Sequence, residues 1–133
     1  MDGTTWYWPA GENPASRRHA RDPGRARLLA PFDPVVWDRR RFEQLWGWAY
    51  RFEAYTPAPQ RKLGYYAQPL LWGDQVVGWG NCSVKDGVLE AGIGVHEARL
   101  RRDPALRRAL RAELDDMVRF LGLLAVRWDW LMR

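Results

Sequence analysis

The chain contains very little cysteine and very little lysine. Cys82 is the only cysteine among 133 residues, so neither an intrachain disulfide nor a multi-cysteine metal site can form. Lys62 and Lys85 are the only lysines, so arginine supplies almost all of the 21 basic residues. No apolar run is long enough to cross a membrane, and residues 1–30 lack the apolar stretch of a signal peptide. We expect a cytoplasmic protein without membrane, metal or cofactor.

Aromatic residues and positive charge dominate what remains. Nine tryptophans need a core or a covered face, because a tryptophan side chain is rarely free in water. The net charge of +5 and the pI of about 9.9 come from arginine, whose planar fork fits phosphate groups. This balance suits a nucleic-acid partner. It also suits a basic protein with an arginine-rich composition, so charge alone leaves the partner open.

Residues 1–27 are predicted to be a poorly ordered N-terminal segment. Trp6, Tyr7 and Trp8 could form an edge strand, whereas residues 9–25 are rich in proline, glycine and arginine and are typical of a linker. A strand is expected at residues 28–30. Residues 28–133 are then expected to form one β-barrel-like domain.

Two helices are predicted from capping and periodicity. Residues 38–46 place apolar side chains on one face, with Asp38 before them and Gly47 as a left-handed C-cap. Asp103 and Pro104 open a longer helix with a 3.6-residue apolar stripe, which Gly122 ends.

Strands are predicted at 48–56, 64–72, 75–84, 88–95 and 123–130, where apolar residues alternate or run together. Asp86-Gly87 is a good hairpin turn, and Gly73-Asp74 is another turn. Glycines at 78, 80, 92 and 94 indicate a bulge or a tight bend. The predicted fold class is α+β: a small antiparallel β-barrel or curled sheet with one short and one long packed helix.

Residues 28–74 carry a linked set of motif residues, with weaker likeness continuing to residue 122. The set resembles the C-terminal region of the YcaQ/AlkZ family of DNA glycosylases. The residues carrying this likeness are Pro31, Phe32, Asp33, Pro34, Trp37, Asp38, Arg39, Gly47, Tyr50, Glu53, Tyr55, Pro57, Gly64, Tyr65, Tyr66, Pro69, Gly73 and Asp74.

The resemblance implies a β-barrel that follows tandem winged helices in a family that unhooks interstrand DNA crosslinks. The sequence departs from that family in three ways. Residues 78–83 lack the charged pair usual after the second glycine turn, and Leu63 replaces an aromatic residue. The family's catalytic Gln-x-Gln or Gln-x-Asp motif, which belongs to the winged helices, occurs nowhere in these 133 residues. Base excision is therefore not transferred to this chain, and no catalytic residue is predicted.

The acidic motif residues have structural explanations. Asp33 and Asp38 lie where carboxylates cap backbone N–H groups, and Glu53 could pair with an arginine across strands. We expect structural roles for the motif residues Phe32, Asp33, Trp37, Asp38, Glu53, Tyr65, Tyr66, Gly73 and Asp74.

Arg61 and Lys62 form a predicted basic hairpin tip beside two tyrosines. Basic tips next to aromatic rings can hold phosphates and stack on bases. Arg61, Lys62, Arg39 and Arg40 are the predicted nucleic-acid contacts. Alternatively the tip is a solvated turn, and one of Tyr65 and Tyr66 is buried because adjacent strand residues face opposite sides. The arginines at 107, 108 and 111 are expected to be a solvated helix face.

Three functions remain open. The first is a non-catalytic, DNA-associated module that contacts duplex DNA and works with a separate winged-helix protein or subunit. The second is a protein-interaction or self-association module that uses a tryptophan-rich face. The third is a complete small glycosylase that uses Asp33 or Glu53.

Overall fold

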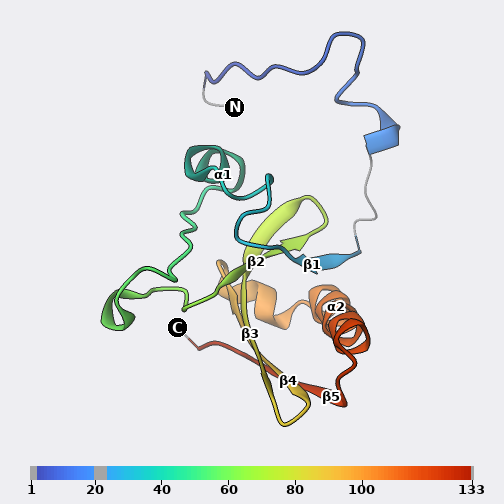
Figure 1. Cartoon of the computed structure of the whole chain (residues 1–133). Coiled ribbons are helices and arrows are strands. Elements are labelled where there is room, and N and C mark those ends of the chain that lie inside the picture. Colours follow the sequence, from blue (N-terminus) through green and yellow to red (C-terminus); the bar gives the residue numbers. More distant parts are fainter. Residues whose placement is uncertain (1–2, 20–23, 133) are drawn as a thin grey trace.

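The computed structural model describes residues 3–19 and 24–132, which form an α+β fold (Figure 1). Five strands make one curled half-barrel sheet in the order β1-β2-β3-β4-β5, and two helices pack on it. The strands are β1 (Ala26–Leu28), β2 (Gln68–Trp72), β3 (Gln75–Lys85), β4 (Val88–Val95) and β5 (Ala125–Trp130). The helices are α1 (Arg39–Trp46) and α2 (Pro104–Leu121), with short 3-10 turns η1 (Arg17–His19), η2 (Ala58–Gln60) and η3 (Ala98–Arg102).

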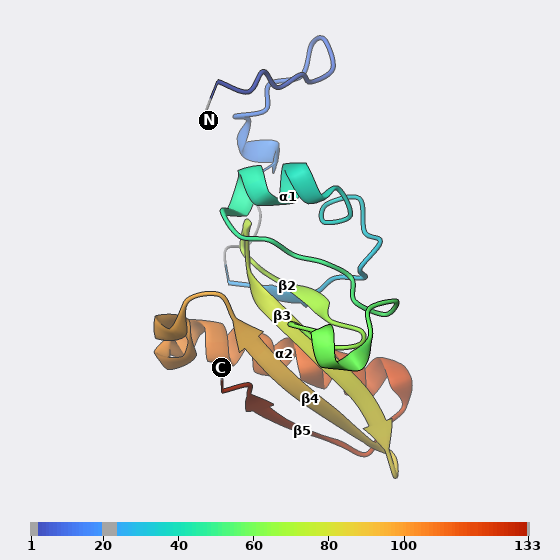
Figure 2. The ribbon, with the colours of Figure 1, turned by 90° about the vertical axis from the view of Figure 1, so that its left-hand side faces the viewer.

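The β3–β4 hairpin is the longest part of the sheet, and β5 lies along its β4 side (Figure 2). Asp86 and Gly87 connect its strands with φ of 49° and 74°. Two successive positive φ values are those of a type I′ turn, whose twist matches that of paired strands. The predicted hairpin and its turn are confirmed.

The predicted final strand is present, but its pairing departs from the antiparallel sheet that was expected. β5 pairs with β4 in parallel, whereas the other three strand pairs are antiparallel. Parallel neighbours need a long crossover connection, and α2 provides it. The order of the sheet leaves β1 and β5 as its two edges in the part of the chain that the structure describes, so the sheet is curled but open.

The strand predicted at residues 48–56 is wrong. This segment is extended and irregular, although its burial alternates from Trp48 to Arg51 as a strand's would. The predicted return strand begins only at Gln68, and β2 already pairs with β1 on one edge and β3 on the other. No free edge of β2 is left for residues 48–56. The basic hairpin tip is therefore a loop that contains η2.

The predicted edge strand at Trp6 to Trp8 is also wrong, since these residues form no strand. Residues 3–19 run outside the body made by the sheet and the helices (Figure 1). β1 begins at Ala26 and so crosses the predicted division after residue 27. Part of the predicted linker, residues 20–23, lies outside the described residues.

Two glycines let the strands curl. β2 and β3 change register between Leu70 and Leu71, which adds a residue to β3 beside Gly78. A Cβ atom on Gly78 would lie 2.1 Å from the carbonyl oxygen of Gly94, so no side chain fits there. A Cβ on Gly94 would lie 2.2 Å from the Trp79 indole, which occupies that space. The predicted bend at these glycines is a bulge beside a close strand contact.

Both predicted helices are confirmed with their caps. The Asp38 side chain accepts hydrogen bonds from the N–H groups of Arg40 and Arg41, and Gly47 ends α1 at φ 71°. The Asp103 side chain caps α2 in the same way, and Gly122 ends it at φ 65°.

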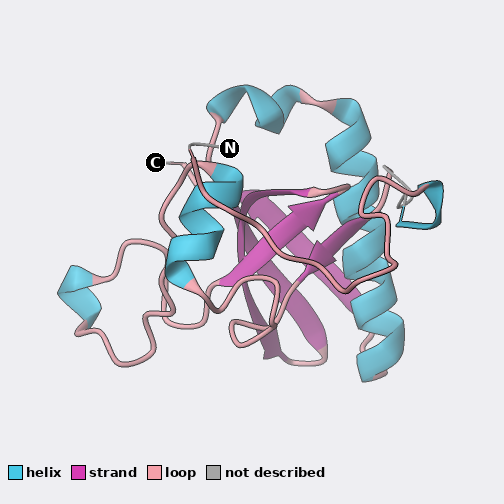
Figure 3. Ribbon diagram, turned by 90° about the horizontal axis from the view of Figure 1, so that it is seen from above, coloured by secondary structure: helices cyan, strands magenta, loops and turns pink. Residues whose placement is uncertain are grey.

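The helices cover opposite faces of the sheet (Figure 3). The α2 layer has an aliphatic core, and its largest fully buried side chains are Leu70, Leu89, Ile93, Leu106, Leu110 and Leu114. The α1 layer comprises α1 and the irregular chain on either side of it. Its core is mainly aromatic and includes Phe42, Trp48, Tyr50 and Trp79.

Candidate nucleic-acid interface

The irregular chain around α1 presents an aromatic and basic surface. We call this surface, which comprises residues 31–39 and 52–66, the aromatic face. It begins at the turn of Asp33, whose Oδ1 accepts the N–H of Val35 at 2.8 Å while its carbonyl accepts those of Val36 and Trp37. This turn leaves the Phe32 and Trp37 side chains 67% and 62% exposed.

Glu53 holds the second half of the aromatic face. Its carboxylate is buried and accepts backbone N–H groups from Lys62 at 2.9 Å, Leu63 at 2.7 Å and Gly64 at 3.1 Å. The expected pairing with an arginine across paired strands is wrong, because no strand pair exists here. A carboxylate that accepts three N–H groups organises a loop the way a helix cap organises a first turn. Glu53 therefore fixes the path of residues 62–64.

Four aromatic rings pack edge to face on this surface. Phe52 lies at the centre, with ring centroids 5.0 Å from Phe32, 5.2 Å from Tyr66 and 6.2 Å from Tyr55. Both Tyr65 and Tyr66 are exposed, so the alternative in which one of them is buried is wrong. That alternative assumed a strand, in which adjacent side chains face opposite sides of the sheet. Residues 61–67 are not in a strand.

The basic side chain of Arg61 lies beside these rings. The Arg61 guanidinium lies 4.9 Å from the Tyr65 ring centroid, and Arg61 Nε donates to the Thr56 carbonyl at 2.8 Å. Lys62, Arg39 and Arg40 are exposed. Arginine held against an aromatic ring keeps N–H groups at its edge for an acceptor such as a phosphate.

A cleft of about 250 Å³ opens between the two halves of the aromatic face. It brings Arg39 together with rings from both sides, and its lining is Pro31, Phe32, Trp37, Arg39, Tyr50, Phe52 and Tyr55. Sequence analysis missed Phe52 and Tyr55 as members of one site with Arg39. Tyr55 was among the residues that resemble the family. The sequence alone, however, provides no reason to place it in one cleft with Trp37.

Two motif residues lie away from the cleft. Gly73 forms the β2–β3 turn at φ 62° and donates its N–H to the Arg25 carbonyl, while the Asp74 carbonyl accepts Trp46 Nε1 at 3.2 Å. These contacts attach α1 and the chain before β1 to the end of the sheet. The contacts agree with the structural roles expected for Gly73 and Asp74, which stay predictions.

The tyrosine beneath the cleft is held neutral. The Tyr50 hydroxyl donates to the Ala67 carbonyl at 2.8 Å inside the α1 layer. Burial raises the pKa of Tyr50 well above its usual value, and the nearby Tyr66 and Glu53 raise it further. Tyr50 therefore acts as a hydrogen-bond donor rather than as an acid or base at neutral pH.

Neither a metal cluster nor a membrane helix is found in the described part of the chain. No three His, Cys, Asp or Glu side chains within residues 3–19 and 24–132 are grouped as metal ligands would be. None of the described helices combines the length and the apolar character needed to traverse a bilayer.

Comparison with known proteins identifies the family. No solved structure matches the chain significantly. The family model described as "DNA glycosylase AlkZ-like" matches residues 1–120, which includes β1 to β4, both helices except the last residue of α2, and the whole aromatic face. The chain therefore belongs to the AlkZ-like DNA glycosylase family.

Proposed function

We propose that this chain is a non-catalytic, DNA-contacting module that works with an AlkZ-like base-excision unit. The observation that carries the proposal is the aromatic face, where exposed rings and basic side chains share one surface. Rings provide stacking surfaces for unpaired bases, and the cations bind backbone phosphates. Exposed rings gathered in this way usually mark a binding site.

The carboxylates of the motif support a non-catalytic role. Asp33 and Asp38 accept N–H groups of their own turns, and Glu53 accepts three N–H groups of its loop. A glycosylase needs a group that activates water beside the sugar of an extruded nucleotide. These three carboxylates are already used in the fold, and the sequence contains no Gln-x-Gln or Gln-x-Asp motif. A separate winged-helix domain or protein would supply the excision step.

The alternative of a tryptophan-rich docking face receives less support. Only Trp6, Trp8 and Trp37 of the nine tryptophans are exposed, and Trp37 already belongs to the aromatic face. Protein association would change little with salt, whereas DNA binding through phosphates weakens steeply as salt rises.

Fluorescence anisotropy with a labelled duplex tests the proposal. Arg39→Gln, Arg61→Gln and Lys62→Gln should each make the slope of log affinity against log salt shallower by about one. Lys85→Gln is the matched control for Lys62→Gln, because Lys85 is also exposed but lies at the end of β3. If the triple variant binds as the unmodified chain does, the aromatic face is not the interface.

An abasic-site assay on alkylated and crosslinked duplex tests the non-catalytic part. We expect no base release by the purified chain. Release that disappears in Asp33→Asn or Glu53→Gln would instead make the chain a complete glycosylase.

A further inference from the structure

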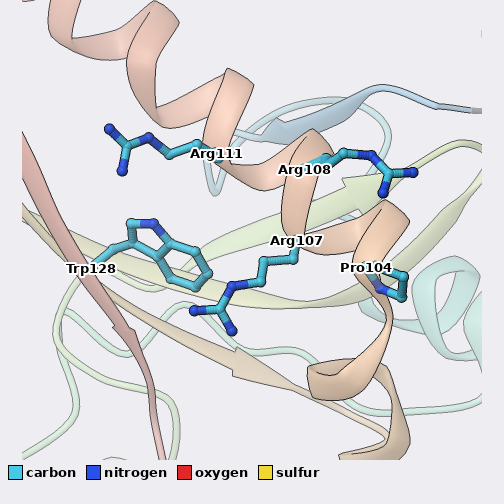
Figure 4. Close-up of a pocket in the computed structure, with 5 residues that line it drawn as sticks. All are labelled: Pro104, Arg107, Arg108, Arg111 and Trp128. Atoms are coloured by element: carbon cyan, nitrogen blue, oxygen red, sulfur yellow. The ribbon is translucent and has the colours of Figure 1, made fainter.

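A second basic groove lies on the other side of the sheet from the aromatic face. Arg107, Arg108 and Arg111 project from α2. Trp128 projects from β5 toward Arg107 and Arg111, whereas the Arg108 side chain extends to the other side of the helix (Figure 4). Together with Pro104 they line an open groove of about 470 Å³, the α2–β5 groove. From the sequence these arginines were expected to be only a solvated helix face, because nothing in the sequence places Trp128 beside them.

The groove is rich in positive charge. Residues 98–112 contain six arginines and one acid, Asp103, whose side chain is used to cap α2. Arg111 donates its Nε to both carboxylate oxygens of Asp115 at 3.0 Å, which compensates its charge. No carboxylate lies within ion-pair distance of Arg107 or Arg108 in the described part of the chain, so these two cations remain uncompensated.

Trp128 fixes the position of one of these cations. The Arg107 guanidinium carbon lies 5.2 Å from the Trp128 ring centroid, and the Trp128 ring packs edge to face with Trp130 at 5.3 Å. Both tryptophans are half-buried against the α2 core. A stacked guanidinium loses less conformational entropy when it binds a ligand, and its N–H edge stays available.

The chemistry of the groove selects an anion whose oxygen atoms accept hydrogen bonds. Guanidinium N–H groups are donors only, so the ligand must supply acceptors. Arg107 and Arg111 are four residues apart, which is about 6 Å along a helix. Asp115 accepts only from Nε of Arg111, so the terminal nitrogens of Arg111 still add donors one turn after Arg107. A chain of phosphates along this axis fits better than a single small anion.

We propose that the α2–β5 groove binds the phosphodiester backbone of a nucleic acid, as a second contact surface of the module. This inference rests on the proposed function that the chain contacts DNA. Since α1 and α2 cover opposite faces of the sheet, one straight duplex cannot lie against both surfaces (Figure 3). The two surfaces therefore contact two separate duplex segments or one strongly bent duplex.

The test uses the full chain and a short fluorescein-labelled duplex of mixed sequence. Arg107→Gln combined with Arg108→Gln should make the salt slope shallower by about two, because two phosphates would no longer be neutralised. Trp128→Leu keeps every cation but removes the ring that holds the Arg107 guanidinium. It should weaken duplex binding, while the slope of log affinity against log salt changes by at most about one. Arg127→Gln is the matched control, because Arg127 is an exposed arginine of β5 that lines a different hollow, with Asn81 and Glu90.

The outcomes separate this inference from the proposed function. A loss of affinity in the groove double variant, but not in Arg127→Gln, supports the groove whatever the variants of the aromatic face do. Binding that depends on Arg39, Arg61 and Lys62 but is unchanged in the double variant overturns the groove and leaves the proposed function standing. No duplex binding by the unmodified chain overturns both.

Inorganic pyrophosphate distinguishes a free phosphate ligand from a nucleic-acid backbone. If titration calorimetry shows pyrophosphate binding that the double variant abolishes, while duplex affinity stays unchanged, the groove takes a small anion and the inference is wrong. Arg107 and Arg108 are exposed, so the double variant should keep the circular dichroism spectrum and the Tm of the unmodified chain. The single variant Arg108→Gln provides the same test with a smaller perturbation.

Discussion

The two layers that cover the sheet are built in different ways. The α2 layer places one 18-residue helix against aliphatic side chains. The α1 layer uses an eight-residue helix, and irregular chain supplies the rest. A helix satisfies most of its own backbone hydrogen bonds, whereas an irregular segment must find partners elsewhere.

Polar side chains provide those partners in the α1 layer. Trp48 Nε1 donates to the Val76 carbonyl at 2.8 Å, Tyr50 donates to Ala67, and Asn81 Nδ2 donates to the Leu63 carbonyl at 2.8 Å. The α2 layer has one comparable attachment, in which Glu113 accepts the N–H of Leu28 and pairs with Arg27 at 3.0 Å. The irregular chain of the α1 layer therefore depends on polar side chains for its order. That layer in turn presents the aromatic face.

The largest expected loss of stability comes from a substitution that creates a cavity in either core. Phe42 is fully buried, and its ring packs against Trp46, Trp48 and Tyr50, so Phe42→Ala should cost about 4 kcal/mol of unfolding free energy. Leu110→Ala, in the α2 layer, should cost about 3 kcal/mol. Urea denaturation followed by circular dichroism measures both changes. Phe42→Ala should additionally weaken DNA binding, because the cleft rests on this core.

Leu124→Ala is the control for these core variants, since Leu124 is 84% exposed and should cost no more than about 0.5 kcal/mol. A cost below about 1 kcal/mol for Phe42→Ala would mean that the α1 layer contributes little to global folding. The two layers would then be separate cooperative units rather than one.

The predictability of the two layers differs because they are built in different ways. The helices, their caps and the β3–β4 hairpin follow from local signals, namely Asp38, Asp103, Gly122 and Asp86-Gly87. Residues 48–56 alternate as a strand does, but pairing depends on which sheet edges are free, and that is a property of the whole fold. The role of Glu53 was missed because its partners, nine to eleven residues away, belong to a loop that was predicted to be a hairpin.

The next effect in size is expected from removing the Glu53 carboxylate. Glu53→Ala leaves three backbone N–H groups without their acceptor and should cost about 3 kcal/mol, whereas Glu53→Gln keeps one acceptor oxygen and should cost about half as much. Limited trypsin digestion provides a local measurement. Cleavage after Arg61 and Lys62 should speed up in both variants, because the loop opens before the sheet does.

Glu43→Ala is the matched control, since the exposed Glu43 side chain should leave both stability and digestion unchanged. Unchanged trypsin cleavage in Glu53→Ala would show that the loop keeps its path without the carboxylate. The explanation of the aromatic face as a surface ordered by Glu53 would then be wrong.

The smallest effect is expected at alkaline pH, where each layer contains a weak acid that is held neutral, namely the half-buried Cys82 and the buried Tyr50. Burial, and then the Glu113 charge, raise the pKa of Cys82 from 9.0 to about 11 in the α2 layer. Burial raises the pKa of Tyr50 in the α1 layer. A raised folded-state pKa favours the neutral form, so the stability from Cys82 is complete below about pH 9 and is lost as pH rises through about 11. The stability that Tyr50 contributes begins to fall once the pH exceeds 10.0, the ordinary pKa of a tyrosine.

Two variants show which layer causes the fall in unfolding free energy at alkaline pH. Cys82→Ala should flatten the fall in unfolding free energy between about pH 9 and about pH 11, and Tyr50→Phe should flatten only the part above about pH 10. Tyr50→Phe also loses the bond to Ala67, so its stability at neutral pH should drop by about 1 kcal/mol. The rate of Cys82 alkylation gives an independent measurement, since near pH 8 it should be about a hundredfold below that of an unburied cysteine. If Cys82 reacts at an ordinary rate, the sheet beneath α2 opens readily, and the α2 layer does not shield the thiol as the structure indicates.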